Sequence, residues 1–297
     1  MNFNIVKRRR ANSKFWNVLF VAAIILVVAS VLFPYLWMIS GSFKRTIEIQ
    51  SADYTKPGQE PSLIPRQPTL ENYQRINRTV PMLRYLRNSL IISIGTMILA
   101  VFISLFAAYA LSRLEFRFKR LYELTIYSTQ MFPGIAFLIP YFILFTAITR
   151  LTGIKLKDTY YGLILTYTSF ALPFCILMMK SYLDSIPKSL DEQALVDGCK
   201  RPAIIFRIIL PLVKPGLVSV GIFAFIMAWN EMLFASVLTG RDTKTVSLGL
   251  MEYITTNQAR WGGMMAACIV VSIPVLILFT TLQKQIIDGL IKGAVKE

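Results

Sequence analysis

One acidic residue, Glu231, lies inside a long apolar segment, directly after Trp229 and Asn230. A charge at the centre of a membrane-spanning helix costs roughly 2.5–3.5 kcal/mol, so such a side chain is expected to face the protein interior or a wet cavity. An aromatic ring beside amide and carboxylate groups suits the binding of a sugar. The alternative role for the same residues is an interhelical hydrogen bond.

Two further polar and aromatic groups lie in apolar segments, each just before a proline. The first is Gln130, and the second comprises Tyr167, Ser169 and Phe170. Aromatic rings stack on sugar faces, while amides and hydroxyls bind sugar hydroxyls. A proline in a membrane helix frees a backbone carbonyl and permits a kink. These groups are therefore predicted to line a solute pathway, with helix–helix packing as the alternative.

The composition gives little indication of a catalytic or metal-binding role. The chain has no histidine and three cysteines, whose spacing indicates neither a disulfide framework nor a metal site. The phosphate-binding motif G-x-x-x-x-G-K-[ST] does not occur. We therefore predict no catalytic residue, no metal ligand and no nucleotide site in this chain.

A charged loop over residues 184–216 separates two apolar segments. Ser189 and Glu192 have the spacing of a capping box, which predicts a short helix over residues 190–197. Asp191 and Glu192 add negative charge to its first turn, which suits the helix dipole. Gly198 is expected to end this helix in the left-handed conformation.

A second helix is expected to follow in the same loop, with Pro202 at its first position. An apolar stripe then recurs at helical spacing, formed by Ile204, Ile205, Ile208 and Ile209. Leu210 and Pro211 mark the return towards the next apolar segment. Such a compact pair of helices suits insertion into a cleft of another protein, and an ordinary linker is the alternative.

The fold class follows from the spacing of charges in this 297-residue, 55% hydrophobic chain. A membrane helix needs about 20 apolar residues, and soluble helices carry a polar stripe instead. Six gaps between charges are long enough: 15–43, 88–112, 124–149, 159–179, 215–240 and 261–283. The chain is predicted to be an all-α, polytopic membrane protein with six transmembrane helices. The basic cluster 7–10 orients both termini towards the cytoplasm.

Five regions follow along the chain. They are a cytoplasmic basic tail (1–14), the first transmembrane helix (15–43), a periplasmic loop (44–87), a transmembrane core (88–285) and a cytoplasmic C-terminal tail (286–297). Five prolines predict an extended periplasmic loop, with one short helix capped by Thr69. The net charge of +16 is spread over loops on both faces, which indicates lipid headgroup contacts rather than nucleic acid. The basic outer face also suits an acidic oligosaccharide or an acidic protein surface.

The spacing of the 184–216 loop resembles the EAA loop of ABC importer permeases. The matching and neighbouring residues are Glu192, Gln193, Ala194, Asp197, Gly198, Ile208, Leu210 and Pro211. Gln193 replaces the usual first alanine, and glutamine is also a good helix former. Agreement elsewhere comes from Asn88-Ser89-Leu90, from Ala228-Trp229-Asn230-Glu231 and from the C-terminal tail with Gly289, Gly293 and Lys296. Over residues 15–297 the chain resembles carbohydrate permeases of the maltose permease G type.

This resemblance implies a permease subunit that moves a carbohydrate, such as an oligosaccharide, by alternating access. It also implies a second homologous permease, two ABC ATPase subunits that bind ATP and Mg, and a periplasmic or lipid-anchored solute-binding protein. The 184–216 loop would be a cytoplasmic coupling helix held by an ATPase, and the C-terminal tail would reach towards the ATPases. The location implied is the bacterial inner membrane, and no cofactor is implied for this chain.

Three alternatives remain at this point. The first is an ABC permease for another solute, such as a polyol or glycerol phosphate. The second is an ion-coupled secondary transporter, although such carriers usually need intramembrane acids and internal repeats, and this chain has one such acid. The third is a membrane-embedded enzyme, which no catalytic constellation supports.

Overall fold

The computed structural model describes residues 3–50, 62–254 and 260–294, with side chains described over 16–50, 62–78, 80–254 and 260–283. The described residues form helices joined by turns, and no strand occurs among them. The chain divides into two compact units, residues 1–79 with 253–270 and residues 80–252 with 271–297.

The first unit contains α1 (Phe3–Ser42), α2 (Thr46–Gln50), α3 (Glu71–Thr79) and the start of α14 (Trp261–Ala294). The Asn72 side chain of α3 donates to the carbonyls of Ser42 and Lys44, both at 2.8 Å. Thr69 accepts a hydrogen bond from the Glu71 amide at the start of α3, close to its predicted capping role. The loop predicted as extended over 44–87 therefore contains two short helices and the first turns of α4, and α1 begins within the predicted basic tail.

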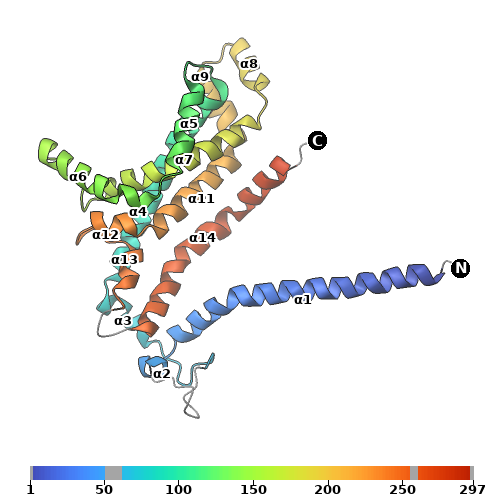
Figure 1. The fold of residues 1–297 in the computed structure, drawn as a ribbon, viewed down its shortest axis with the longest axis vertical. Coiled ribbons are helices and arrows are strands. Elements are labelled where there is room, and N and C mark those ends of the chain that lie inside the picture. Colours follow the sequence, from blue (N-terminus) through green and yellow to red (C-terminus); the bar gives the residue numbers. More distant parts are fainter. Residues whose placement is uncertain (1–2, 51–61, 255–259, 295–297) are drawn as a thin grey trace. The chain divides into compact units, whose positions relative to one another are not determined.

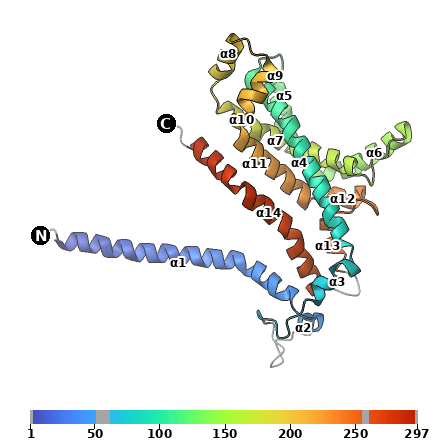
Figure 2. The same cartoon turned by 180° about the vertical axis from the view of Figure 1, so that it is seen from behind.

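Three long helices form the centre of the second unit: α4 (Met82–Arg113), α7 (Tyr160–Asp184) and α11 (Lys214–Asn230). Contacts of Tyr160 with Asn88 and of Asp184 with Ser112 show that α4 and α7 run in the same direction. Gly216 at the start of α11 faces Tyr182 near the end of α7, so α11 runs the opposite way. Figures 1 and 2 show the three helices side by side from opposite directions.

Small residues allow these helices to pack closely. A Cβ atom at Gly216 would lie 2.6 Å from the Tyr182 ring, and one at Gly95 would lie 2.5 Å from Ile164. The buried core between the helices includes Ala100, Ala108, Ala171, Met179, Val220 and Ala224. Small residues at helix crossings let backbones approach within a membrane, where the hydrophobic effect does not drive helices together.

The third predicted span, 124–149, is not one helix. It is divided into α5 (Lys119–Thr129), a 3₁₀ turn η1 (Gly134–Phe137) and α6 (Leu138–Thr152). Pro133 accounts for the break, because it donates no amide hydrogen and disfavours a helical conformation at the preceding residue. Pro140 lies in the first turn of α6, where proline is tolerated.

The fifth predicted span, 215–240, is also broken. Helix α11 ends at Asn230, Glu231 is extended (φ −67°, ψ 124°), and α12 (Leu233–Leu238) follows. No proline or glycine causes this break. Instead the Glu231 carboxylate accepts a hydrogen bond from the Phe234 amide at 2.8 Å, so the side chain satisfies an amide at the start of α12. A last short helix, α13 (Val246–Met251), follows the 239–245 loop.

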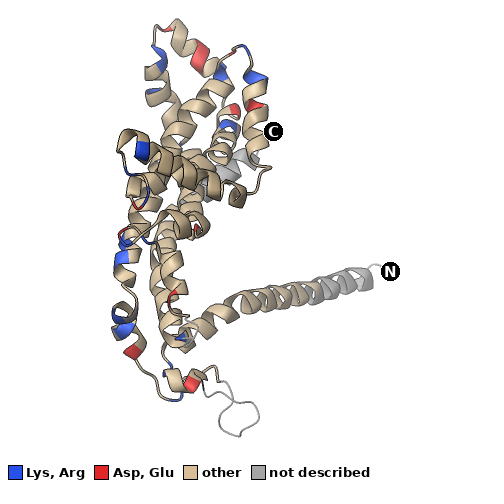
Figure 3. Cartoon of the chain, turned by 60° about the vertical axis from the view of Figure 1, so that its left-hand side comes forward, with Lys and Arg blue, Asp and Glu red and all other residues tan. Residues whose placement is uncertain are grey.

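Among the described residues, five helices are long and apolar enough to cross a membrane. The number is six when the segments 201–212 and 214–230, which meet at an angle of 80°, count as one span. Figure 3 shows few charged residues along the long helices and more in the segments that join them. The structure thus confirms an all-α membrane fold, with two of the six predicted spans interrupted.

Candidate functional site

The predicted helix of the 184–216 loop is present as α8 (Ser189–Val196), at one end of the α4–α7–α11 bundle (Figures 1 and 2). The capping-box prediction is wrong. Lys188 already has helical angles (φ −63°, ψ −25°), its carbonyl accepts from the Asp191 and Glu192 amides, and no side chain caps the helix. Ser189 is therefore the first helical residue, where its hydroxyl has no capping role. Asp191 and Glu192 do lie in the first turn.

The predicted end of α8 at Gly198 is confirmed. Gly198 has φ +79°, in the left-handed region that favours glycine. The Cys199 amide donates to the Ala194 carbonyl at 2.9 Å, and the Gly198 amide donates to the Leu195 carbonyl at 3.0 Å. These two bonds form a Schellman motif, which closes the last turn and reverses the chain.

A buried ion pair joins α8 to the end of α4. The Arg113 Nε lies 2.8 Å from an Asp191 carboxylate oxygen, and the two side chains are only 4% and 9% exposed. The Tyr109 hydroxyl donates to the other Asp191 oxygen at 3.3 Å. Because both partners are buried, loss of either one would leave an unpaired charge in a poorly solvated place. Asp191 therefore ties α8 to the bundle.

Further bonds from the end of α4 extend this connection. Arg113 also donates to the carbonyl of Ile186 at 2.9 Å, and Ser112 donates to the Asp184 carboxylate at 2.5 Å. We call Tyr109, Ser112, Arg113, Asp184 and Asp191 the α4 brace. None of the five was predicted as a site residue. Asp191 and Ala194 lie three positions apart on one face of α8, and both are buried.

The rest of the loop returns the chain to the bundle through α9 (Arg201–Ala203), a π-helical turn η2 (Ile204–Ile209) and α10 (Leu210–Leu212). Pro202 is the second helical residue rather than the first. Ile204, Ile205 and Ile209 are buried in the bundle core, and Ile208 and Leu210 pack against it. Pro211 is exposed. The predicted apolar stripe therefore anchors the loop, and the bend towards α11 follows it.

The opposite face of α8 is exposed. Glu192, Gln193, Asp197 and Gly198 are exposed, and a Cβ atom at Gly198 would meet nothing within 4 Å. Val196 is 88% exposed, although it is apolar. The predicted coupling residues thus separate into a buried set with Ala194 and an exposed set on one surface. We call residues 192, 193 and 196–198 the α8 outer face.

At the other end of the bundle, Asn88 holds the 239–245 loop. Its side-chain amide donates to the carbonyls of Asp242 and Lys244 at 2.9 and 3.0 Å, and its oxygen accepts from the Tyr160 hydroxyl at 2.7 Å. The neighbouring Ser89 accepts from the Val246 amide at 2.9 Å. The Asn88-Ser89 pair noted in the sequence therefore positions a loop between α12 and α13.

Asp158 supports the same 239–245 loop from the start of α7. One carboxylate oxygen accepts from the Gly240 amide, the Thr243 amide and the Thr243 hydroxyl, at 2.8, 3.1 and 2.7 Å. Partial burial opposes ionisation of Asp158, but these hydrogen bonds outweigh it and lower the pKa of the carboxyl group. Asp158 itself has φ +55°, a conformation that aspartate tolerates better than most residues.

Three of the predicted pathway residues come together near the broken helices. The Phe170 ring lies 4.6 Å from that of Phe234 on α12 and 5.4 Å from that of Tyr141 on α6. The Ser169 hydroxyl is 2.6 Å from the Tyr141 hydroxyl. Tyr167 is buried in the same apolar cluster as Phe234. Its hydroxyl is buried without a hydrogen-bond partner among the described residues.

The other predicted pathway residues lie apart from this aromatic group. The Trp229 ring is buried and stacks on Phe225, with ring centroids 5.4 Å apart. The exposed Asn230 side chain donates to the Ile226 carbonyl of its own helix. Gln130 is exposed at the break after α5. Of the C-terminal residues, Gly289 and Gly293 lie in α14, and Lys296 lies outside the described residues.

Known proteins resemble this chain over nearly its whole length. The family described as "Binding-protein-dependent transport system inner membrane component" matches residues 100–292. The inner membrane ABC transporter permease protein YcjP of Escherichia coli is 38% identical over 93% of this chain and 95% of its own. The trehalose/maltose transport system permease protein MalG of Thermococcus litoralis is 36% identical over 94% and 97%.

A solved structure shares the fold. It is the crystal structure of a bacterial ABC transporter involved in the import of the acidic polysaccharide alginate, with a TM-score of 0.74 and 20% identity over 92% of this chain and 97% of the matched chain. The family match and the relatives together decide the classification. This chain belongs to the family of inner-membrane components of binding-protein-dependent transport systems, as a multi-pass permease.

Proposed function

We propose that this chain is the permease subunit of an ABC importer for a carbohydrate, and that the α8 outer face docks onto a separate ATPase subunit that binds ATP and Mg. The observation that carries the proposal is the two-sided character of α8. One side is fixed to α4 by the buried Arg113–Asp191 pair, and the other side exposes polar groups and the apolar Val196. A short helix held in this way transmits a displacement of its partner to α4, whereas a loose loop would absorb it.

The orientation and the partners follow from this role. The 184–216 loop and both termini lie in the cytoplasm, because an ATP-driven partner works there. The basic cluster 7–10 supports this direction. A second permease would complete the pathway, two ATPases would bind below, and a solute-binding protein would deliver substrate at the 239–245 end.

A carbohydrate substrate is supported by the aromatic group at the helix breaks and by the named substrates of the relatives. Phe170, Tyr141 and Phe234 provide ring faces, and Ser169 provides a hydroxyl beside them. Glu231 lies at the discontinuity between α11 and α12, and discontinuous helices form the solute sites of many transporters. We infer that Tyr167, Ser169, Phe170 and Glu231 line the pathway, with Gln130, Trp229 and Asn230 as supporting positions.

The docking role is tested most simply at Val196. Because this side chain is 88% exposed, Val196→Asp leaves the fold intact but places a charge in the contact with the ATPase. Co-purification of the ATPase and ATP-dependent uptake should both fall by at least about tenfold, equivalent to 1.4 kcal/mol. The matched control is Val196→Thr, which keeps the shape and should behave as the wild type. Full retention of ATPase by the Asp variant would disprove docking through this face.

Gly198 provides a second test that separates steric contact from backbone strain. Gly198→Leu is expected to prevent stable ATPase association, but a left-handed φ of +79° also strains a leucine. Asparagine tolerates this conformation better, so Gly198→Asn introduces a side chain with less strain. Loss of ATPase association in both variants supports close packing of Gly198 against the ATPase. Normal association of both would contradict it.

The energy source is tested by uptake in proteoliposomes that contain the co-purified partners, with trehalose and maltose as the first sugars. Uptake should require ATP and should survive an ionophore that abolishes proton and sodium gradients. Uptake that continues without ATP and stops with the ionophore would favour the ion-coupled alternative.

A further inference from the structure

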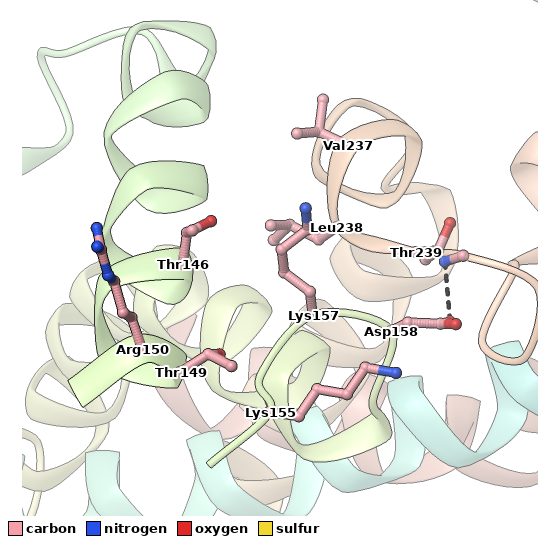
Figure 4. Close-up of a pocket in the computed structure, with 10 residues that line it drawn as sticks. Thr146, Thr149, Arg150, Lys155, Lys157, Asp158, Val237, Leu238 and Thr239 are labelled. Carbon is pink, nitrogen blue, oxygen red and sulfur yellow. Dashed lines mark hydrogen bonds between the residues drawn. The ribbon is translucent and has the colours of Figure 1, made fainter. Parts of the chain in front are cut away.

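An open cavity of about 700 Å³ lies between the end of α6 and the end of α12, at the 239–245 end of the bundle. Basic residues lining it are Arg150, Lys155 and Lys157, and its one acidic residue is Asp158. Figure 4 shows Thr146 and Thr149 of α6 directed towards the segment with Lys157 and the end of α12, while the Arg150 side chain extends along α6 itself. The lining therefore carries more positive than negative charge.

The basic side chains of this cavity have no ion-pair partner among the described residues. Over the described ranges, no salt bridge pairs Arg150, Lys155 or Lys157 with a carboxylate, and Lys157 lies 3.8 Å over the ring of Phe142 instead. Asp158 is occupied, since its oxygen accepts hydrogen bonds from Gly240 and Thr243. The cavity is thus built to receive an anion.

Three threonine hydroxyls place a second requirement on the ligand of this cavity. Thr146, Thr149 and Thr239 each donate to the carbonyl four residues earlier in their own segment, at 2.8, 2.8 and 2.6 Å. A hydroxyl that has given its proton to a carbonyl offers only acceptor lone pairs to the cavity. A complementary ligand therefore combines a negative charge with hydroxyl donors.

The surface leading to the cavity is apolar. On α6, Ile139 and Ile143 are exposed, and Thr146 and Arg150 continue the same face at spacings of three and four residues. Helix α6 belongs to a segment long and apolar enough to span the membrane, and Arg150 lies in its last turn. The stripe thus joins an apolar surface suited to lipid tails to a basic cavity near one end of an apolar span, and basic residues at such positions attract anionic lipid headgroups.

We propose that this cavity binds the headgroup of an anionic phospholipid that carries free hydroxyls, of the phosphatidylglycerol type. Arg150 and Lys157 contact the phosphate, and the threonines accept from the glycerol hydroxyls. One acyl chain lies along Ile139 and Ile143. The cavity volume falls within the range of small-molecule sites, which is about 300–1,000 Å³.

The test uses the transporter purified with its partners and native mass spectrometry with lipids of identical acyl chains. Phosphatidylglycerol should bind about tenfold or more tightly than phosphatidylcholine, and Arg150→Gln/Lys157→Gln should abolish this preference. The matched control, Arg87→Gln/Arg241→Gln, removes two exposed basic residues near the same end that do not line the cavity, and it should retain the preference. Equal melting temperatures show that both double variants are folded.

Two further binding measurements identify the ligand. Thr149→Val should weaken phosphatidylglycerol more than phosphatidic acid, because only the former carries glycerol hydroxyls. Soluble glycerol phosphate should compete poorly, because it lacks the acyl chains. The proposal is overturned if the Arg150→Gln/Lys157→Gln variant keeps the wild-type preference, if a partner subunit covers the cavity so that no preference exists, or if glycerol phosphate displaces the lipid completely.

Discussion

The α4–α7 pair holds a loop at each of its ends, and the buried contacts differ between the two ends. An exposed Arg84–Asp242 ion pair also reaches the 239–245 loop, but exposed pairs contribute little to stability. At the 184–216 end, the Arg113–Asp191 ion pair joins two side chains from different helices. At the 239–245 end, Asn88 and Asp158 bind backbone groups of the loop itself. Side-chain pairing fixes the position of a whole helix, whereas backbone pairing fixes the shape of a loop.

This difference matches what each end must do under the proposed function. A coupling helix keeps its own hydrogen bonds and needs a firm attachment to the transport helices. A loop without regular structure needs partners for its buried backbone groups, because unpaired ones are costly. Four predictions test this contrast, from the largest expected effect to the smallest.

Breaking the ion pair should have the largest effect. Arg113→Met leaves the Asp191 carboxylate buried without its cationic partner, and the free energy of unfolding in detergent should fall by about 3–5 kcal/mol. ATPase co-purification should fall with it, because α8 loses its attachment. The double variant Arg113→Met/Asp191→Leu removes both charges and should recover most of the stability. An equal loss of stability in the single and double variants would contradict a role for the Arg113–Asp191 pair.

Asn88→Leu should have the next largest effect. It removes the donors to the partly buried carbonyls of Asp242 and Lys244, and the free energy of unfolding should fall by about 2–3 kcal/mol in total. Limited proteolysis of the assembled transporter should then cut the 239–245 loop faster, while ATPase co-purification stays normal. Asn230→Leu is the control, since that exposed amide binds only its own helix. An unchanged cleavage rate would show that Asn88 does not hold this loop.

Asp158 should confer a pH dependence on the 239–245 loop. Its pKa is lowered in the folded state, so its stabilising contribution is complete above the ordinary value of about 3.9 and is lost as the pH falls through the folded-state value. Cleavage of this loop should therefore accelerate in acid. Asp158→Asn should lose about 2 kcal/mol at neutral pH and remove that dependence, because the amide oxygen accepts the same three hydrogen bonds without the charge that strengthens them. If the Asp158→Asn variant kept the wild-type pH dependence of loop cleavage, this role of Asp158 would be refuted.

Gly198→Ala should have the smallest effect on folding. The position is open, so the cost is limited to the left-handed backbone, about 1–2 kcal/mol for a residue with a Cβ atom. Loss of stability should be measurable in the isolated permease. A larger loss of stability than in Arg113→Met would mean that the turn at Gly198, rather than the ion pair, contributes most to the stability of the 184–216 loop.

The sequence was sufficient for several features that depend on neighbours along the chain, although the predicted Ser189–Glu192 cap does not form. Charge spacing identified the apolar helices, and the glycine after an amphipathic segment identified the end of α8. The breaks at Pro133 and Glu231 were not predicted as helix ends. Proline and a single acid permit a kink or a break equally well, and the surrounding packing decides between them.

The α4 brace could not be predicted from the sequence, because Arg113 and Asp191 lie far apart along the chain and meet only when α4 and α7 run side by side. Likewise Asn88 was recognised within a pattern, but its partners in the 239–245 loop appear only in the fold. Asp191 was assigned to the helix dipole, although its side chain is turned to Arg113. Local rules describe each helix, and long-range pairing determines how the helices act together.

The central claim, that the 184–216 loop is a cytoplasmic docking element, can be tested at Cys199. This native cysteine is exposed directly after Gly198, whereas Cys175 is buried. A membrane-impermeant maleimide should label it in inside-out vesicles stripped of ATPase, and not in right-side-out vesicles. Rebinding of the ATPase should protect it, and Cys199→Ser should remove the signal. Labelling from the outer side, or labelling that the bound ATPase leaves unchanged, would contradict the proposed coupling.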